Sequence, residues 1–449
     1  MIRFLFFLLL IITTNTLPIA AVTGGNVPKK YAKLSTVKSL TNGRGVKFLF
    51  MEDNSAPLVH VRLAFKYSGS AYQEKSRAGL PEFFSRAVFC GCGEYSPVQL
   101  ERKVNDLAAI VDCSSNCDAI TFSLTVPKLV LKDGIALLNA IITKPKFEKD
   151  RVKLIKDNLV ARLQNYVLNP SAMVSSVFIP SVIFESHPYG NGKFGTAEDL
   201  SKLSIDDLKK YQSDFIGTSN AEACVFGNVS ESEAVNLLDE TLKGVPVGTL
   251  TKDIVLDTEP VVRQILKEFY EETPQSTVMF VLRSARHNSA RRYSAAVLCL
   301  TLGGAGIFGS RIMSLLRTKE GLIYGGSTHV LHLNHASYLL GSLKTKNSNV
   351  KKTIEFLKKI IEDIRINGIT AEDLEFAKNH LSGSAVVALR TSGDMCDFFF
   401  REMQKGGGET ALEDLLNGIN AVQLEDVNAL AKETLDENNI LFVTVGGNE

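Results

Sequence analysis

The feature that most constrains the fold of this 449-residue sequence is that the order of its expected strands and helices occurs twice. Apolar residues at every second position predict strands, and apolar residues at every third or fourth position predict helices. Such patterns fill residues 28–245 and 261–449, and a linker at 246–260 that begins and ends with proline separates them. We therefore expect two tandem, homologous domains.

The expected elements indicate an α+β fold. Strands come in adjacent pairs rather than alternating singly with helices, so each domain should hold a mostly antiparallel sheet packed with helices. The expected strands are 46–51, 59–65, 120–126, 221–229, 278–282 and 440–445. The expected helices are 81–89, 129–142, 150–166 and 290–302, with further apolar stripes at Leu100, Val104, Leu107 and Val111 and at Ile354, Leu357, Ile361 and Ile364.

One histidine, His60, lies within an expected strand. His60 shares the polar face of its strand with Arg62 and Lys66, at a period of two residues. We expect His60 to be a histidine at the surface of the sheet.

The charge balance excludes an overall attraction to nucleic acid or to anionic lipid. Lys and Arg number 50 against 49 Asp and Glu, which gives a formal net charge of +1. We therefore expect no nucleic-acid partner.

The N-terminus has the order of a secretory signal peptide. One positive charge at Arg3 precedes an apolar run at 4–12, and the small residues Ala20 and Ala21 follow. The run is too short for a membrane anchor, because a spanning helix needs about 20 residues. We expect residues 1–21 to be removed, the mature chain to have no membrane span, and the protein to be exported to a periplasm.

Four of the seven cysteines form two close pairs in the first half. Cys90 and Cys92 are two positions apart, and Cys113 and Cys117 are four apart. A local disulfide or a four-thiolate metal site are both open alternatives. The single residue between Cys90 and Cys92 is shorter than the usual spacing in zinc sites, which disfavours the metal.

Three local strings give the chain a resemblance to a known family. They are Ala78-Gly-Leu-Pro-Glu-Phe-Phe-Ser-Arg-Ala-Val-Phe89, His187-Pro-Tyr-Gly190 with Phe194-Gly-Thr196, and Gly309-Ser-Arg311 leading into Leu316-Arg-Thr-Lys-Glu-Gly-Leu-Ile-Tyr324. With the duplicated halves, they resemble the pitrilysin/insulinase family of zinc metallopeptidases, over nearly the whole mature chain. The resemblance implies tandem α+β domains that enclose a peptide chamber.

The zinc motif of that family is degenerate here. Active members carry H-x-x-E-H, in which two histidines bind zinc and the glutamate acts on water. The matching positions are Glu82, Ser85 and Arg86, and the third ligand position falls near Ala161 or Arg162, where no acid stands. We expect no metal and no catalytic residue in this chain. Glu82 and Arg86 should instead form an i,i+4 ion pair.

The second half keeps the family's other conserved pair, Arg317 and Tyr324, on either side of Gly321. In family members these residues face the zinc site of the other half. A guanidinium can donate to peptide carbonyls, and a phenol can donate to a developing oxyanion. The resemblance implies that Arg317 and Tyr324 bind substrate. The alternative is that Tyr324 is only a strand aromatic and Arg317 a solvated base at a helix end. The glycine-rich run at 303–309 lacks the ending of a P-loop and is expected to be a loop before a substrate-facing helix.

The remaining histidines give weaker signals. His329, His332 and His335 are spaced by three, so a three-histidine metal site would need an irregular loop, and polar loop-tip histidines are the simpler interpretation. His187 begins a turn between helical segments and is interpreted as structural.

Together these features predict a substrate-binding partner subunit of a heterodimeric zinc metallopeptidase. The chain would not be catalytic alone and would hold no cofactor, because the zinc would lie in a related, separately encoded subunit. The expected ligand is a peptide. Two alternatives remain: a structural subunit similar to the core subunits of the respiratory cytochrome bc complex, which would need a mitochondrial presequence, and a peptide-binding or chaperone-like module.

Overall fold

A computed structural model describes residues 36–165, 170–249, 252–253, 255, 257–263, 265–304, 306–436 and 438–447. The predicted signal peptide, residues 1–21, lies outside the described residues. Within those ranges, no helix is both long enough and apolar enough to cross a bilayer.

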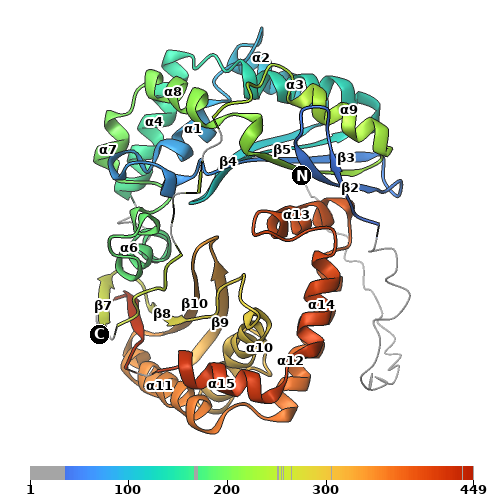
Figure 1. The fold of residues 1–449 in the computed structure, drawn as a ribbon. Helices are drawn as coiled ribbons and strands as arrows, with labels where there is room; N and C mark the ends of the chain where they lie inside the picture. Colours follow the sequence, from blue (N-terminus) through green and yellow to red (C-terminus); the bar gives the residue numbers. More distant parts are fainter. Residues whose placement is uncertain are drawn as a thin grey trace, which may run out of the picture. The chain divides into compact units, whose positions relative to one another are not determined.

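The first half of the chain forms a six-stranded sheet (Figure 1). Its strands are β1 (Lys38–Thr41), β2 (Lys47–Glu52), β3 (Leu58–Lys66), β4 (Ile110–Ser115), β5 (Ala119–Pro127) and β6 (Ala221–Gly227). They lie in the order β1-β2-β6-β3-β5-β4, and only the β2–β6 pair is parallel. The predicted period of two is visible in β5, where Ile120, Phe122, Leu124 and Val126 are fully buried.

The second half forms a five-stranded sheet. Its strands are β7 (Ile265–Tyr270), β8 (Gln275–Arg283), β9 (Ile323–His332), β10 (Ser337–Lys346) and β11 (Leu441–Gly446). They lie in the order β7-β11-β8-β10-β9, and only the β7–β11 pair is parallel. The predicted α+β fold with two mostly antiparallel sheets is therefore confirmed.

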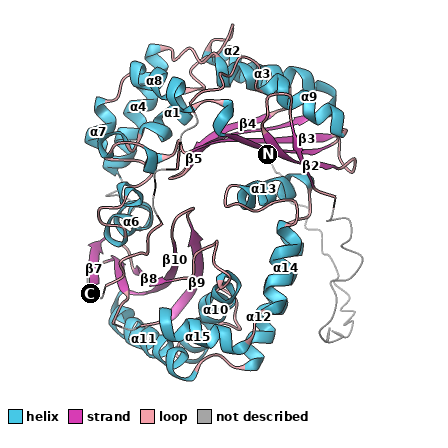
Figure 2. Ribbon diagram, viewed as in Figure 1, coloured by secondary structure: helices cyan, strands magenta, loops and turns pink. Residues whose placement is uncertain are grey.

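Helices cover both sheets, as Figure 2 shows. The first half holds α1 (Leu80–Ala87), α2 (Pro97–Asp106), α3 (Leu131–Thr143), α4 (Lys149–Gln164), α5 (Pro170–Met173), α6 (Ile179–Ile183), α7 (Ala197–Lys202), α8 (Ile205–Phe215) and α9 (Glu231–Thr241). The second half holds α10 (Arg292–Gly303), α11 (Val350–Asn367), α12 (Ala371–Ala388), α13 (Ser392–Met403), α14 (Ala411–Ala421) and α15 (Leu424–Thr434). Two π-helical turns, 174–178 and 313–319, adjoin α6 and β9.

One predicted helical stripe is wrong at its end. α2 stops at Asp106, and Val111 lies in the edge strand β4. Ala108, two residues beyond the helix, has φ +46°, a left-handed conformation that ends a helix. The apolar spacing of Leu107 and Val111 therefore continued across a turn that the pattern did not reveal.

The expected position of His60 is also wrong. The side chain lies on the face of β3 opposite the main core, but α13 covers that face, and His60 is only 7% exposed. Its Nδ1 lies 3.0 Å from the Thr125 hydroxyl, and burial lowers its pKa. A segment more than 300 residues away in the sequence thus turns a surface strand position into an interior one.

Candidate functional site

Helix α1 carries the degenerate zinc motif. Pro81 stands in its first turn, where the missing N–H costs no helical hydrogen bond. Phe83 and Phe84 are fully buried, so the helix is fixed against the core, and Glu82 between Pro81 and Phe83 is only 2% exposed. Ser85 is buried, and its hydroxyl donates to the Glu82 backbone carbonyl at 2.8 Å. A serine has no carboxylate to act as a general base, and the Ser85 hydroxyl is already held by this hydrogen bond.

The carboxylate of Glu82 is fully engaged by donors. Arg86 Nε and Nη2 donate to Oε1 at 3.1 and 3.0 Å, which confirms the predicted i,i+4 ion pair. The Ser115 hydroxyl donates to Oε2 at 3.0 Å, and Lys193 Nζ lies 3.3 Å from the same oxygen. A buried carboxylate needs this many donors to offset its desolvation. The sequence pattern gave no signal for Ser115 or Lys193.

The third ligand position lies beside the first, as the resemblance implied. Arg162 on α4, Glu82 and Phe194 line the same small cavity of about 10 Å³, which is about the room one water needs. The Arg162 guanidinium lies 5.8 Å from the centroid of the Phe194 ring, and Lys193 Nζ lies 5.2 Å from it. The structure therefore gathers the positions that hold zinc in active members.

These residues do not fit a zinc ion. Arg86 and Lys193 pair with the Glu82 carboxylate, and Arg162 lines the same cavity. These three cations would repel a dication. Across the part of the chain that the structure describes, no three His, Cys, Asp or Glu side chains are grouped to hold a metal. The ion cluster joins α1, β4 and the 193–194 segment.

Two strings of the family resemblance meet at a close backbone contact. A Cβ on Gly79 would lie 2.4 Å from the Phe194 carbonyl oxygen, and one on Gly195 would lie 2.8 Å from the Gly79 nitrogen. Gly195 also has φ +63°. Only glycine fits this contact, which fixes Phe194 and Lys193 beside α1.

In the second half, a tight turn positions Arg317 and Tyr324. The Leu322 N–H donates to the Leu316 carbonyl at 2.8 Å, and Gly321 between them has φ +61°. Leu316 is fully buried and Leu322 is 5% exposed, so both sides of the turn are anchored. Arg317 directly follows Leu316, Tyr324 lies two residues after Leu322, and both side chains are exposed.

Tyr324 occupies a special place in the sheet. β9 is an edge strand, and its register with β10 shifts so that Ile323 pairs with Thr345 and Gly325 pairs with Lys344. Tyr324 is therefore the extra residue of a β-bulge, and its side chain is 47% exposed. Bulges of this kind redirect side chains beside functional sites.

Arg317 contacts an exposed aromatic ring. Its guanidinium carbon lies 4.8 Å from the centroid of Phe308, which is 63% exposed. Phe308 belongs to the glycine-rich run 303–309, in which Gly306 has φ +70°. Gly303 ends α10, and residues 306–309 lie in a loop before the π-helical turn 313–319, where Phe308 adds an aromatic ring to the Arg317 surface.

The three spaced histidines do not form one site. His332 ends β9, and its Nδ1 lies 2.7 Å from the Ser337 hydroxyl, while burial lowers its pKa to about 4. His335 lies in the turn that follows, with its ring nitrogens 2.9 Å from Asp253 and 3.1 Å from Asp257. The loop-tip interpretation holds for His335 but is wrong for His329 and His332, which lie in β9.

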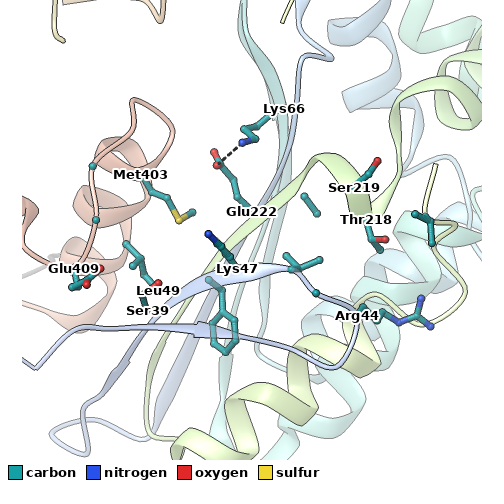
Figure 3. Close-up of a pocket in the computed structure, with 17 residues that line it drawn as sticks. Ser39, Arg44, Lys47, Leu49, Lys66, Thr218, Ser219, Glu222, Met403 and Glu409 are labelled. Carbon is teal, nitrogen blue, oxygen red and sulfur yellow. Dashed lines mark ion pairs between the residues drawn. The ribbon is translucent and has the colours of Figure 1, made fainter. Parts of the chain in front are cut away.

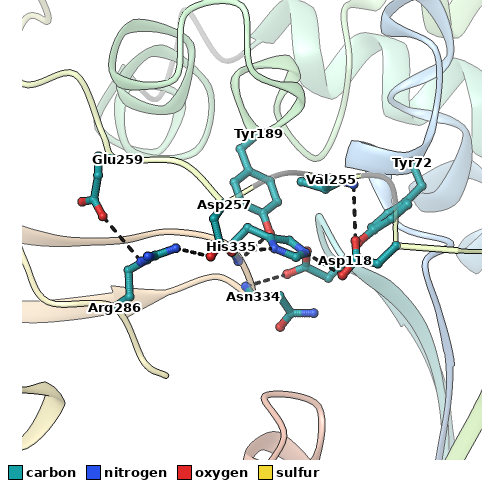
Figure 4. Close-up of polar contacts among 10 residues, drawn as sticks. Tyr72, Asp118, Tyr189, Val255, Asp257, Glu259, Arg286, Asn334 and His335 are labelled. Atoms are coloured by element: carbon teal, nitrogen blue, oxygen red, sulfur yellow. Dashed lines mark hydrogen bonds and ion pairs between the residues drawn. The ribbon is translucent and has the colours of Figure 1, made fainter. Parts of the chain in front are cut away.

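His335 belongs to a polar network that the sequence did not reveal, shown in Figure 4. Tyr189 donates to Asp118 at 2.7 Å and accepts from the His335 N–H at 3.1 Å. Asp118 also accepts from the Asn334 N–H at 3.3 Å, and burial raises its pKa. His187, interpreted as structural, accepts from the Tyr189 N–H at 3.2 Å. The network ties the β9–β10 turn to the first half of the chain.

A separate pocket of about 430 Å³ lies between β1, β2, β6 and the segment after α13 (Figure 3). Glu222 on β6 lies within it, with Oε2 3.6 Å from Lys66 Nζ and Oε1 buried without a hydrogen bond. Burial raises the pKa of Glu222 to about 7. This half-satisfied carboxylate contrasts with Glu82.

All seven cysteines are free thiols in the structure, including those of the two close pairs. Burial raises the pKa of Cys90, Cys92 and Cys117 to about 11. These three thiols are therefore protonated at neutral pH.

Comparison with known proteins agrees with this geometry. A family profile described as "Insulinase (Peptidase family M16)" matches residues 47–197, and one described as "Peptidase M16 inactive domain" matches residues 202–381. The chain therefore belongs to the insulinase family of peptidases. By its motif positions it is a non-catalytic member, since it carries neither the zinc histidines nor the general-base glutamate.

Several relatives resemble the chain over most of its length. It is 23% identical to the non-peptidase homolog YmxG of Helicobacter pylori over 408 residues, 90% of this chain and 92% of the relative. It is 21% identical to the uncharacterized zinc protease YmxG of Bacillus subtilis, covering 85% and 92%. A crystal structure of a peptidase M16 inactive domain from Pseudomonas fluorescens superposes with a TM-score of 0.84 at 21% identity, covering 92% and 98%, and shows a shared fold.

Proposed function

We propose that this chain is the substrate-binding subunit of a heterodimeric zinc metallopeptidase, exported to a periplasm. The zinc would lie in a related subunit encoded separately, and this chain would supply Arg317 and Tyr324 to it. The observation that carries the proposal is that these two side chains are exposed on a rigid turn, whereas Glu82 is buried and saturated.

The chemistry of the two exposed groups suits a peptide in a zinc site. The Tyr324 phenol can donate a hydrogen bond to the oxyanion that forms when water attacks a peptide carbonyl. The Arg317 guanidinium can donate to carbonyl oxygens of an extended peptide. Anchoring by Leu316 and Leu322 supports the role, because a donor that is already in place costs no reorganisation during the reaction.

The export proposal rests on the sequence of residues 1–21. A periplasmic location would also separate this chain from the mitochondrial core subunits that it resembles in having lost the zinc ligands. Fractionation of the source cells tests it, and recovery in a mitochondrial matrix fraction would contradict it.

The first experiment purifies the chain from its native source without chelator and measures its zinc content and its companions. A zinc-free chain that accompanies a related subunit with an intact H-x-x-E-H motif supports the proposal. One zinc per lone chain, with peptide cleavage, would contradict it. A chain that captures unfolded peptides, with no peptidase subunit beside it, would assign a peptide-binding module instead.

A further inference from the structure

Helix α13 belongs to the second half of the sequence but packs on the sheet of the first half. It lies on the face of β3 and β6 opposite the main core of that sheet. Its buried side chains recur every three or four residues and face the sheet; they are Ser392, Met395, Cys396, Phe399 and Phe400. A Cβ on Gly393 would lie 3.0 Å from His60 Cε1, so the helix approaches closely.

Two contacts fix the register of α13 on the sheet. Arg62 Nε donates to Asp397 at 2.7 Å, and the rings of Phe226 and Phe399 lie 5.8 Å apart. In the ladder, Arg62 is the cross-strand partner of Cys224. The salt bridge therefore holds Asp397 beside the strand position that Cys224 occupies.

The same register brings two thiols together. Cys224 shares a sheet face with Phe226, two residues along the strand, and Cys396 lies one helical turn before Phe399. Cys224 and Cys396 therefore lie in the same contact between β6 and α13, their side chains interact, and both residues are 0% exposed. Burial is the first cause that raises the pKa of Cys224, and the contact with Cys396 is the second.

We propose that Cys224 and Cys396 are the site of a disulfide that joins α13 to the first sheet. The reaction is exchange with a protein or small-molecule disulfide. The thiolate of one cysteine attacks a donor sulfur and releases the donor's first thiolate. The second cysteine then attacks the mixed disulfide and releases the donor's other thiolate. The two cysteine thiols lose two protons and two electrons, and the donor disulfide is reduced to two thiols.

Burial determines when this bond forms. Only the thiolate reacts, and the buried thiol of Cys224 holds its proton tightly in the folded chain. The bond should therefore form during folding, while α13 is still accessible, and should resist reductant afterwards. A disulfide between elements this distant in sequence removes a large loop entropy from the unfolded chain. The inference is independent of the proposed peptidase role.

The test refolds the reduced full-length chain in a glutathione redox buffer, blocks remaining thiols with iodoacetamide and maps the peptides without reduction. We expect a linked Cys224–Cys396 peptide as the dominant species, with the other five cysteines alkylated. A natively refolded chain in which both cysteines are alkylated, or in which either is linked elsewhere, would overturn the proposal.

Variants separate the bond from general effects of losing a thiol. Oxidised protein should unfold at a Tm higher than reduced protein by roughly 5 °C. Cys396→Ala should abolish this difference. Cys299→Ala is the matched control, because Cys299 is also buried but contacts Thr328 Oγ1 at 3.5 Å. If the difference survives in Cys396→Ala, another pair carries it and the proposal is wrong.

Discussion

The two motif regions of the molecule, around Glu82 and around Arg317, differ in the exposure and hydrogen bonding of their polar side chains. In the first half, Glu82 and Arg86 stand where active relatives bind zinc, and the carboxylate is buried and bonded to Arg86, Ser115 and Lys193. In the second half, Arg317 and Tyr324 are exposed at a turn and a β-bulge. A buried carboxylate with all its hydrogen-bond donors in place stabilises the fold. Donors that are exposed at the surface remain free to bind a ligand. The first region therefore has a structural role, and the second region presents the exposed donors that the proposed binding role requires.

The largest expected effect concerns the second region. In the complex with the zinc-bearing subunit, Tyr324→Phe should lower kcat about 100-fold or more, because it removes one oxyanion donor. The Tm should not change, since the ring is half exposed and its hydroxyl lies outside the core. Tyr270→Phe is the matched control, as Tyr270 is 64% exposed on β7. Peptide cleavage at the wild-type rate would show that Tyr324 takes no part in the reaction.

The first region should respond in stability rather than in activity. Glu82→Gln removes the negative charge that Arg86 and Lys193 share, and we expect a loss of about 2–3 kcal/mol in the free energy of unfolding. The figure is below the range for fully buried pairs because both cations reach solvent. Urea unfolding measures it. Glu268→Gln, at an exposed position of β7, should stay within about 0.5 kcal/mol, and an equal effect in both variants would contradict the assignment.

Glu222 tests whether saturation by donors is what makes a buried carboxylate stabilising. Its pKa is raised from its usual 4.5 to about 7, so the folded chain holds this proton more tightly than the unfolded chain. The free energy of unfolding should fall as pH rises from 4.5 through about 7 and stay lower above that.

Glu222→Gln should therefore stabilise the chain by about 2 kcal/mol at pH 8.5 and have little effect at pH 4.5. This sign is opposite to that expected for Glu82→Gln. Thermal or urea unfolding of the two variants at both pH values makes the comparison. Destabilisation by Glu222→Gln at pH 8.5 would mean that the Lys66 ion pair outweighs the burial of the charge.

The smallest effect is expected at Arg86. Its side chain is 46% exposed, and Ser115 and Lys193 would remain on Glu82 after its removal. Arg86→Ala should cost about 1 kcal/mol or less, and high salt should reduce the difference. A loss as large as that of Glu82→Gln would show that the guanidinium alone maintains the site.

Much of the fold was predictable because local periodicity reports burial directly. β3 and β5 and the long helices α3, α4 and α11 carry clear patterns, and the Glu82–Arg86 pair follows from helical spacing alone. The strands β1, β4, β7, β9 and β10 were not predicted. β1 has only four residues, and β7 is exposed along most of its length, so neither shows a period of two.

The contacts between distant segments were not predictable. His60 was expected at a surface and is buried under α13. Lys193 lies beside Glu82 because Gly79 and Gly195 allow a close backbone contact, and no periodic pattern indicates such a contact. The Arg317 and Tyr324 motif was found by resemblance, but its bulge geometry was not. Their proposed role in substrate binding stays a prediction.

The sequence by itself determined the duplicated α+β plan and the loss of the zinc motif, because periodicity and residue identity are local properties that need no partner. Only the tertiary structure decided what replaced the metal, how Tyr324 is directed outward, and that Cys224 meets Cys396. Each of these depends on groups far apart in the chain. Their proximity is set by packing, which no single segment encodes.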